Sequence, residues 1–173
     1  MKGILALDLA TSLGWARADE AALDRWCKLG GLTPGCGPVV GVTYGTVRLG
    51  GNCLAARLNH FYRWYARVLS SDQVSRVYYE MALPARQQSS IQAAKVALGL
   101  AGIVQAVAWD HSIGCTDVPI ATIKKSFTGD GRARKHQMVE AARHRGWEPD
   151  SEDAADALGL LDHAAMLEAR RAA

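Results

Sequence analysis

The sequence has few cysteines, and their spacing excludes the common cysteine-based sites. Cys27, Cys36, Cys53 and Cys115 form no C-x-x-C pair and have no histidines at the spacing of zinc ligands. A structural zinc site is therefore not expected. We interpret the four residues as reduced thiols with a structural role.

The sequence also lacks a long hydrophobic run near its beginning. The first ten residues, MKGILALDLA, carry one lysine and a short apolar stretch before Asp8, which is too little for a signal peptide or a membrane span. We therefore expect a cytoplasmic protein that does not associate with a membrane. The chain has 173 residues, of which 49% are hydrophobic, enough for a single domain over residues 1–173 that needs no disulfide or metal to hold its core.

Acidic side chains are scarce in one segment and basic side chains in the next, although the net charge is only +3. Residues 124–145 carry seven lysines or arginines and two acids, whereas residues 146–173 carry seven acids and two arginines. Such charge runs are usually solvated helix faces. A cationic cluster also suits a polyanion such as nucleic acid, and the acidic segment then needs an explanation of its own.

Hydrophobic periodicity and turn residues predict an α/β layer sandwich, with a mixed five-stranded sheet flanked by helices. Short apolar or alternating runs predict strands at residues 3–10, 15–18, 42–49, 75–80 and 118–127, with a tight turn at Gly14. Apolar spacings of three and four predict helices at residues 54–69, 89–109, 132–145 and 152–170, with Ser151 as the N-cap of the last helix. Glycine and proline punctuation predicts an irregular insertion at residues 19–42.

Four carboxylates fall at the ends of predicted strands or in the first turns of the last predicted helix. Asp8 ends the first predicted strand and Glu80 the fourth, while Asp153 and Asp156 share one face of the last helix because they are three residues apart. Carboxylates that meet at adjacent strand ends repel one another, and burying them together costs several kcal/mol unless cations neutralise them. Mg²⁺ or Mn²⁺ suits such a group because these hard cations prefer carboxylate oxygen.

Each acid also has a plain structural explanation. Asp8 can be a turn former, Glu80 a surface residue at a strand end, and Asp153 a partner of the helix dipole. Asp156 is explained least well in this way. The sequence therefore gives the hypothesis that the four acids form part of a metal site.

Four segments together resemble a known family. They are ILALDLATSLGWA at the start, VYYE in the middle, then IKKSFTGDGRARKHQMV and SEDAADALGLLDHA. In this order and at these separations they resemble RuvC-type Holliday junction resolvases, of the diverged sort carried by bacteriophages. The resemblance implies a ribonuclease H-like fold, a homodimer, and Mg²⁺-dependent cleavage of two opposed strands at a four-way DNA junction.

The resemblance also implies roles for particular residues. It gives Asp8, Glu80, Asp153 and Asp156 as catalytic metal ligands, and it gives Lys124 and Lys135 as DNA contacts. Phosphodiester hydrolysis is well served by two metal ions about 3.5–4 Å apart, so we expect two Mg²⁺ ions, with Mn²⁺ as a substitute. We expect Lys135 to stabilise the phosphate in catalysis, and we expect flanking phosphates to be bound by Lys124, Lys125, Arg132 and Arg134.

One loop departs from the family pattern. The family has an aromatic residue near the fourth-strand glutamate, whereas this chain has Met81, Leu83 and Pro84. An apolar side chain still unstacks bases, so the departure bears on selectivity among branched substrates. The next residues, Arg86, Gln87 and Gln88, either contact DNA or are solvated.

The five tryptophans are too scattered to form a stacking platform by spacing alone, so we expect them in the core or at an interface.

Paired cuts in a junction require two active sites related by a two-fold axis, so the resolvase hypothesis predicts a homodimer. A helix rich in small residues, 93–108, is the candidate interface.

Other hypotheses remain open: a nuclease with broader branched-DNA or RNA specificity, a non-catalytic junction-binding module, or an ATPase of the sugar-kinase and actin type. The ATPase requires a second phosphate loop that this chain lacks.

Overall fold

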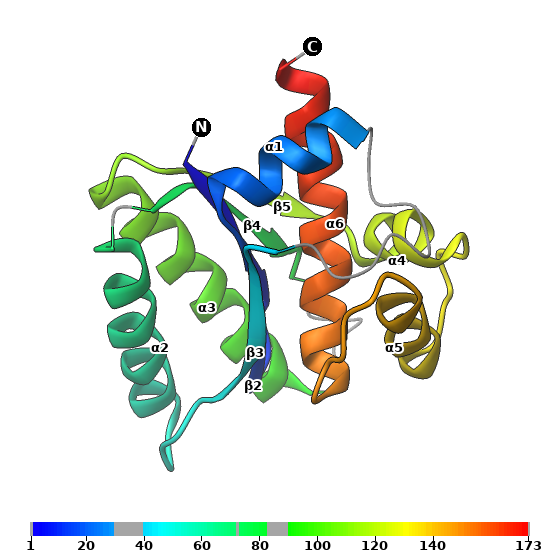
Figure 1. The fold of residues 1–173 in the computed structure, drawn as a ribbon. Coiled ribbons are helices and arrows are strands. Elements are labelled where there is room, and N and C mark those ends of the chain that lie inside the picture. The colour runs from blue at the N-terminus through cyan, green and yellow to red at the C-terminus, as the bar shows by residue number, and fades with distance from the viewer. Residues whose placement is uncertain (1, 30–39, 72, 83–89, 173) are drawn as a thin grey trace.

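A single five-stranded sheet forms the centre of the molecule. The computed structural model describes residues 2–29, 40–71, 73–82 and 90–172 (Figure 1). The strands, in the sheet order β3-β2-β1-β4-β5, are β1 (Gly3–Asp8), β2 (Ser12–Ala18), β3 (Val42–Arg48), β4 (Val74–Glu80) and β5 (Gly114–Val118). The first three strands pair antiparallel, and β1, β4 and β5 run parallel. The sheet is therefore mixed, which confirms the predicted fold class.

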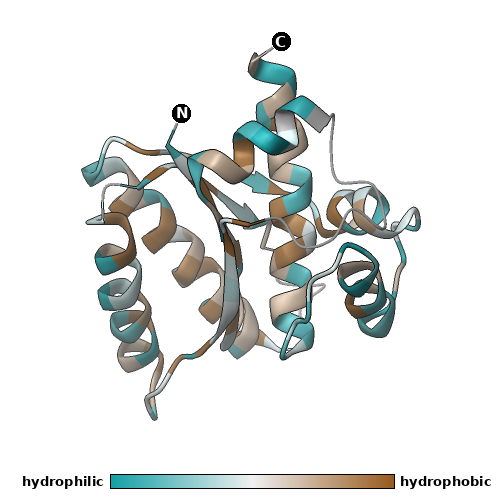
Figure 2. Ribbon diagram, in the orientation of Figure 1, coloured by the Kyte–Doolittle hydropathy of each residue, from teal (hydrophilic) through white to brown (hydrophobic). Residues whose placement is uncertain are grey.

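Helices cover both faces of this sheet. Their bounds are α1 (Glu20–Leu29), α2 (Leu54–Leu69), α3 (Ile91–Asp110), α4 (Ile120–Thr128), α5 (Lys135–His144) and α6 (Glu152–Ala172). Figure 1 shows α2 and α3 on one side of the sheet and the other helices on the opposite side. In β1, Leu5 and Leu7 face α2 and α3, whereas Ile4 and Ala6 face α6. This alternation places hydrophobic side chains on both faces of the sheet. In Figure 2, hydrophobic residues lie along the strands and along the helices on either side of them.

Among the described residues, one helix, α3, is long and apolar enough by composition to cross a membrane. Eight of its residues are buried, and six of these, including Leu100 and Val104, belong to the core on the α2 side of the sheet. A buried core helix passes the same test of length and composition as a membrane span. We therefore describe α3 as a core helix.

The strand predicted at residues 118–127 is wrong. The strand β5 lies earlier, at Gly114–Val118, and α4 occupies most of the predicted range. Pro119 precedes the helix with φ −61°, and Gly129 ends it with φ 86°. The isoleucines and threonines of this segment suggest a strand, but Ile123 and Phe127 are four residues apart and are buried on one helix face.

The irregular insertion predicted at residues 19–42 contains a helix. α1 begins after Asp19, whose side chain accepts a hydrogen bond from the Ala22 backbone N–H at 2.8 Å. Ala22 and Trp26 are four residues apart and are buried against α6. Residues 30–39 lie outside the described residues, as do Cys36 and the side chain of Cys27. The other two cysteines, Cys53 and Cys115, are free thiols.

Gly14 lies inside β2, where it pairs with Asp8 of β1, and not in the tight turn that the sequence predicts. A Cβ atom at this position would lie 1.9 Å from the backbone oxygen of Asp153. Only glycine allows α6 to come this close to the sheet. Gly14 therefore sets the distance between the end of β1 and the start of α6.

We expect the substitution Gly14→Ala to lower the free energy of unfolding by about 2–3 kcal/mol, because the added methyl group forces β2 and α6 apart. Gly102→Ala in α3 is the control, since a Cβ atom there would meet nothing within 4 Å. This control is expected to raise stability by about 0.5–1 kcal/mol. Urea denaturation measures both values, and equal stabilities for the two variants would contradict the close approach.

Candidate active site

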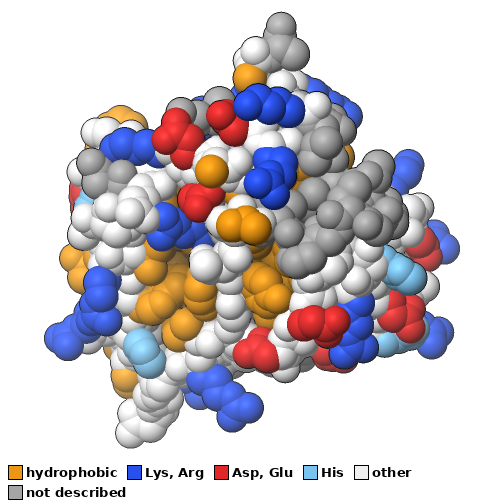
Figure 3. Space-filling model, in the orientation of Figure 1, with side chains coloured by type: hydrophobic (Ala, Val, Ile, Leu, Met, Phe, Trp, Pro, Cys, Tyr) orange, Lys and Arg blue, Asp and Glu red, His pale blue; other side chains and the backbone are white. Residues whose placement is uncertain are grey.

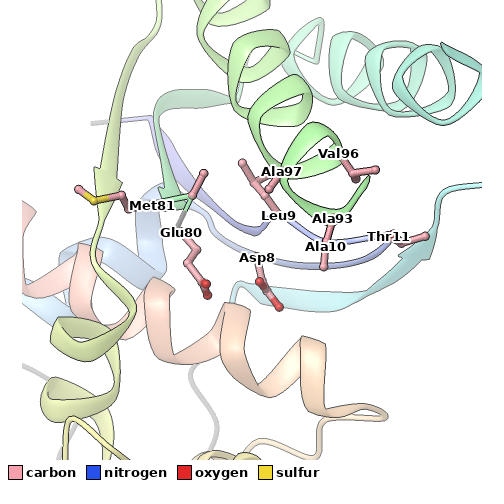
Figure 4. Close-up of a pocket in the computed structure, with 10 residues that line it drawn as sticks. Asp8, Leu9, Ala10, Thr11, Glu80, Met81, Ala93, Val96 and Ala97 are labelled. Carbon is pink, nitrogen blue, oxygen red and sulfur yellow. The ribbon is translucent and has the colours of Figure 1, made fainter. Parts of the chain in front are cut away.

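Two carboxylates stand at the ends of neighbouring strands. Asp8 ends β1 and Glu80 ends β4, and the parallel pairing sets Leu7 beside Tyr79, which brings the following residues together. Figure 4 shows both carboxylates pointing the same way, toward the first turns of α6. They line a cleft of about 250 Å³ whose other wall includes Ala93, at the start of α3.

The first two turns of α6 carry the other two acids, Asp153 and Asp156. Ser151 caps this helix as predicted, because its Oγ accepts a hydrogen bond from the Ala154 backbone N–H at 3.0 Å. Ala154 and Ala155 are fully buried, and their small side chains let the helix lie against the sheet. The acids of α6 are thereby held beside the ends of β1 and β4.

Two contacts from β3 hold the segment that precedes α6. Thr46 Oγ1 and Ser151 Oγ lie 2.5 Å apart, and the Glu148 backbone N–H donates to the Tyr44 hydroxyl at 3.0 Å. The partners are more than one hundred residues apart in the sequence. The sequence analysis missed both contacts because no local pattern links such distant positions.

The electrostatics of the four acids show that they share one site. Burial raises the pKa of Asp8 well above its ordinary value, and the charges of Glu80, Asp156 and Asp153 raise it further. Burial, with the charge of Asp156, raises the pKa of Glu80 to about 7. Burial raises the pKa of Asp156 to about 6, although nearby lysines oppose the shift. The residues that the sequence analysis singled out are therefore close enough to repel one another.

Lys135 partly neutralises this acidic group. Its Nζ donates to Asp153 Oδ1 at 3.3 Å and lies 3.5 Å from Glu152 Oε2. Burial lowers the pKa of Lys135, but the bond to Asp153 and the neighbouring negative charges outweigh burial and raise the pKa. Glu152 belongs to this group as well. The sequence analysis missed it, because at a helix start it looks like a solvated acid.

Lys124 also lies within electrostatic reach of the acids. Its charge lowers the pKa of Glu80 and of Asp156. Its Nζ donates to the backbone oxygen of Ala133 at 2.7 Å, which ties α4 to the loop before α5. This contact leaves Lys124 beside the acids and adds a structural role to the DNA contact that the sequence predicts.

The remaining predicted DNA contacts, Lys125, Arg132 and Arg134, have exposed side chains on α4 and on the loop that leads to α5. The Arg132 backbone N–H donates to Asp130 Oδ1 at 2.9 Å, which orders this loop. Met81 is 39% exposed at the rim of the acidic cleft. The other loop residues of interest, Leu83, Pro84, Arg86, Gln87 and Gln88, lie outside the described residues.

The donor set suits a hard divalent cation. Among the oxygens of the four acids, the buried Asp156 Oδ1 has no hydrogen-bond partner within the described part of the chain. Three of the four acids have raised pKa values, which means that their negative charges are not fully compensated by the protein. Within the same residues, however, no three histidine, cysteine or acidic side chains are arranged as a ready metal site. The lysine contact with Asp153 supplies part of the missing positive charge.

Comparisons with known proteins identify the family. The model of the crossover junction endodeoxyribonuclease RuvC family matches residues 24–161. The chain belongs to the RuvC family. The match contains Glu80, Asp153 and Asp156, and it begins after Asp8. Family membership makes this protein a junction-resolving endonuclease, and nucleases of the RuvC family depend on a metal ion, generally Mg²⁺.

Solved structures agree in fold over nearly the whole chain. The Thermus thermophilus RuvC structure has a TM-score of 0.67 at 19% identity and covers 96% of this chain and 95% of its own. T. thermophilus RuvC in complex with Holliday junction substrate has a TM-score of 0.70 at 16% identity, with 98% of each chain covered. The yeast mitochondrial Holliday junction resolvase has a TM-score of 0.61 at 7% identity and covers 97% of this chain and 80% of its own. No curated protein sequence gives a significant match. The RuvC structures share the ribonuclease H-like fold, as predicted here.

The raised pKa values predict how stability depends on pH in the absence of metal ions. The folded protein keeps the protons of Glu80 and Asp156 up to about pH 7 and about pH 6, whereas the unfolded chain releases them near pH 4. Stability contributed by these groups is therefore present at low pH and is lost as the pH rises through this window.

We expect the thermal midpoint in EDTA to fall more steeply between pH 4 and pH 7 for the natural sequence than for Asp8→Asn, which removes one repelling charge. Differential scanning calorimetry of both proteins measures the difference, and other titrating groups cancel in the comparison. Identical pH profiles would contradict the electrostatic coupling of Asp8 to the other acids.

Proposed function

We propose that this RuvC-family endonuclease resolves four-way DNA junctions, and that Asp8, Glu80, Asp153 and Asp156 form its metal site. The observation that carries the proposal is the meeting of four carboxylates from three distant segments, at the cost of raised pKa values. A purely structural site has no reason to gather uncompensated charges, whereas a metal site requires them. Two metal ions, Mg²⁺ or Mn²⁺, suit four carboxylates.

Such ions would supply an activated water molecule and would stabilise the departing 3′ oxygen. The four acids would hold and orient the ions, and the cleft beside α3 would admit the scissile phosphate. Lys135 Nζ donates to Asp153 in the free protein, and it would be available to donate to a phosphate oxygen if a metal ion neutralised the acids. The same lysine thus balances the acids in the free protein and the phosphate in the complex.

The cationic side chains of α4 and the following loop extend this site along the DNA. Phosphates that flank the cleavage point are contacted by Lys124, Lys125, Arg132 and Arg134. Contacts of this kind do not read the DNA sequence. Their positive charge offsets the repulsion between the acids and DNA. T. thermophilus RuvC has a solved complex with Holliday junction substrate, which supports the same class of substrate for this chain. We expect the protein to act in the cytoplasm, which is that of a bacterial host if a phage encodes the protein.

Paired incisions require a second copy of the site, which a two-fold homodimer provides. The helix α3 offers a surface for it, since Ile91, Leu98 and Trp109 are 76%, 58% and 83% exposed. These residues are seven and eleven positions apart, so they lie along one face of the helix. We propose that this face meets the same face of a second copy.

Asp8→Asn is expected to lower the rate of junction nicking by at least about 100-fold, because it removes a metal ligand, while junction binding persists. The control is Asp150→Asn, which changes an exposed acid in the loop before α6. The measurement is a time course with a labelled four-way junction, with and without Mg²⁺. Undiminished nicking by Asp8→Asn would refute the catalytic assignment.

Leu98→Glu is expected to convert the protein to a monomer and to replace paired incisions by single nicks, because it puts a charge into the apolar face. Val40→Glu is the control, since Val40 is 75% exposed and lies just before β3, at the opposite edge of the sheet from β5, which α3 contacts. Sedimentation velocity gives the mass of each variant. A dimeric Leu98→Glu protein would rule out the α3 interface.

A further inference from the structure

A pocket of about 350 Å³ lies between α2 and the neighbouring strands β2 and β3, away from the acids. Trp15 and Arg17 of β2 and Trp64 and Arg67 of α2 line it, and we call it the Trp15–Trp64 pocket. Trp15 points to the α2 side of the sheet because Gly14, its neighbour, faces α6. The volume of the pocket is within the range of small-molecule sites.

The two indoles line the pocket without stacking on each other. Their centroids are 6.3 Å apart and their planes meet at 54°. Trp64 also contacts Phe61, with ring centroids 6.1 Å apart, and Trp15 lies beside Gly45. Trp15 and Trp64 are both partly exposed and pack at the edge of the core on this side of the sheet. An indole with a free face binds a planar ring by stacking.

The surface around the pocket is basic. The sequence has no acidic residue between Asp24 and Asp72, and α2 carries three arginines, Arg57, Arg63 and Arg67. Figure 3 shows hydrophobic side chains in the hollow between α2 and β3, with basic side chains around them and acidic side chains at the upper edge.

Acidic residues mark the limit of this surface on one side. A neighbouring hollow contains Asp19 and Glu20 together with Lys2 and Arg17. Arg17 Nη2 donates to the Gln73 side chain, and none of the described residues that line the Trp15–Trp64 pocket is acidic. A ligand of the pocket is therefore expected to be negatively charged and to enter from the α2 side.

We propose that the Trp15–Trp64 pocket binds an unpaired segment of single-stranded DNA. A base stacks on the indoles, and the adjacent phosphates contact Arg67 and Arg63, which are one turn apart on α2. Aromatic faces beside arginines favour a nucleic acid over an acidic peptide, because the peptide supplies charge without planar rings. DNA as the ligand rests on the proposed function, but binding in this pocket involves none of the four acids.

The binding test uses the full chain in EDTA, where nicking does not occur, so its outcome is independent of the nuclease assignment. Fluorescence anisotropy measures the affinity for a labelled oligodeoxythymidylate and for an abasic strand of equal length. Trp64→Leu is expected to weaken binding of the first about tenfold and to leave binding of the second unchanged. An equal effect on both strands would overturn the stacking, and binding of polyglutamate that depends equally on Trp64 would assign the pocket to an acidic peptide.

A second pair of variants tests the charge without changing the core. Arg63→Gln with Arg67→Gln is expected to weaken binding about tenfold and to lower the salt slope by about 1.4, since each phosphate contact on a single strand contributes about 0.7. The matched control, Arg25→Gln with Lys28→Gln, removes the same charge from exposed positions on α1. Equal affinities for the two double variants would contradict the proposal.

Discussion

The active site depends on four carboxylates that the fold holds together against their mutual repulsion. Asp8 and Glu80 are fixed by the parallel pairing of β1 and β4, and α6 brings Asp153 and Asp156 to the same place. Packing supplies the force that holds them, because α6 is buried along most of its length against the sheet. Burial and, after it, the neighbouring negative charges raise the pKa values of these acids, and Lys135 offsets only part of this cost.

Close backbone packing and two hydrogen bonds hold the four acids together. Gly14 lets the backbone of α6 touch β2, and Thr46 and Tyr44 tie β3 to the segment before the helix. The acids are therefore positioned by backbone packing and by contacts that are not themselves charged. Such a frame keeps the donor atoms in place when a divalent cation or a phosphate enters, which is the requirement for a preorganised site.

The sequence predicted the features that have a local signature. Strand ends located Asp8 and Glu80, and the spacing of three residues put Asp153 and Asp156 on one helix face. The helix α1 was missed because glycines and prolines follow it closely, and α4 was taken for a strand because its β-branched residues outweighed their helical spacing. Glu152 and the Thr46 contact had no signature at all, since tertiary packing alone brings their partners near.

Anomalous diffraction from crystals soaked in Mn²⁺ tests the central claim most directly. The account predicts anomalous density between Asp8, Glu80 and the aspartates of α6, with Lys135 moved away from Asp153. Density at another place, or an intact Lys135–Asp153 contact in crystals saturated with Mn²⁺, would contradict it.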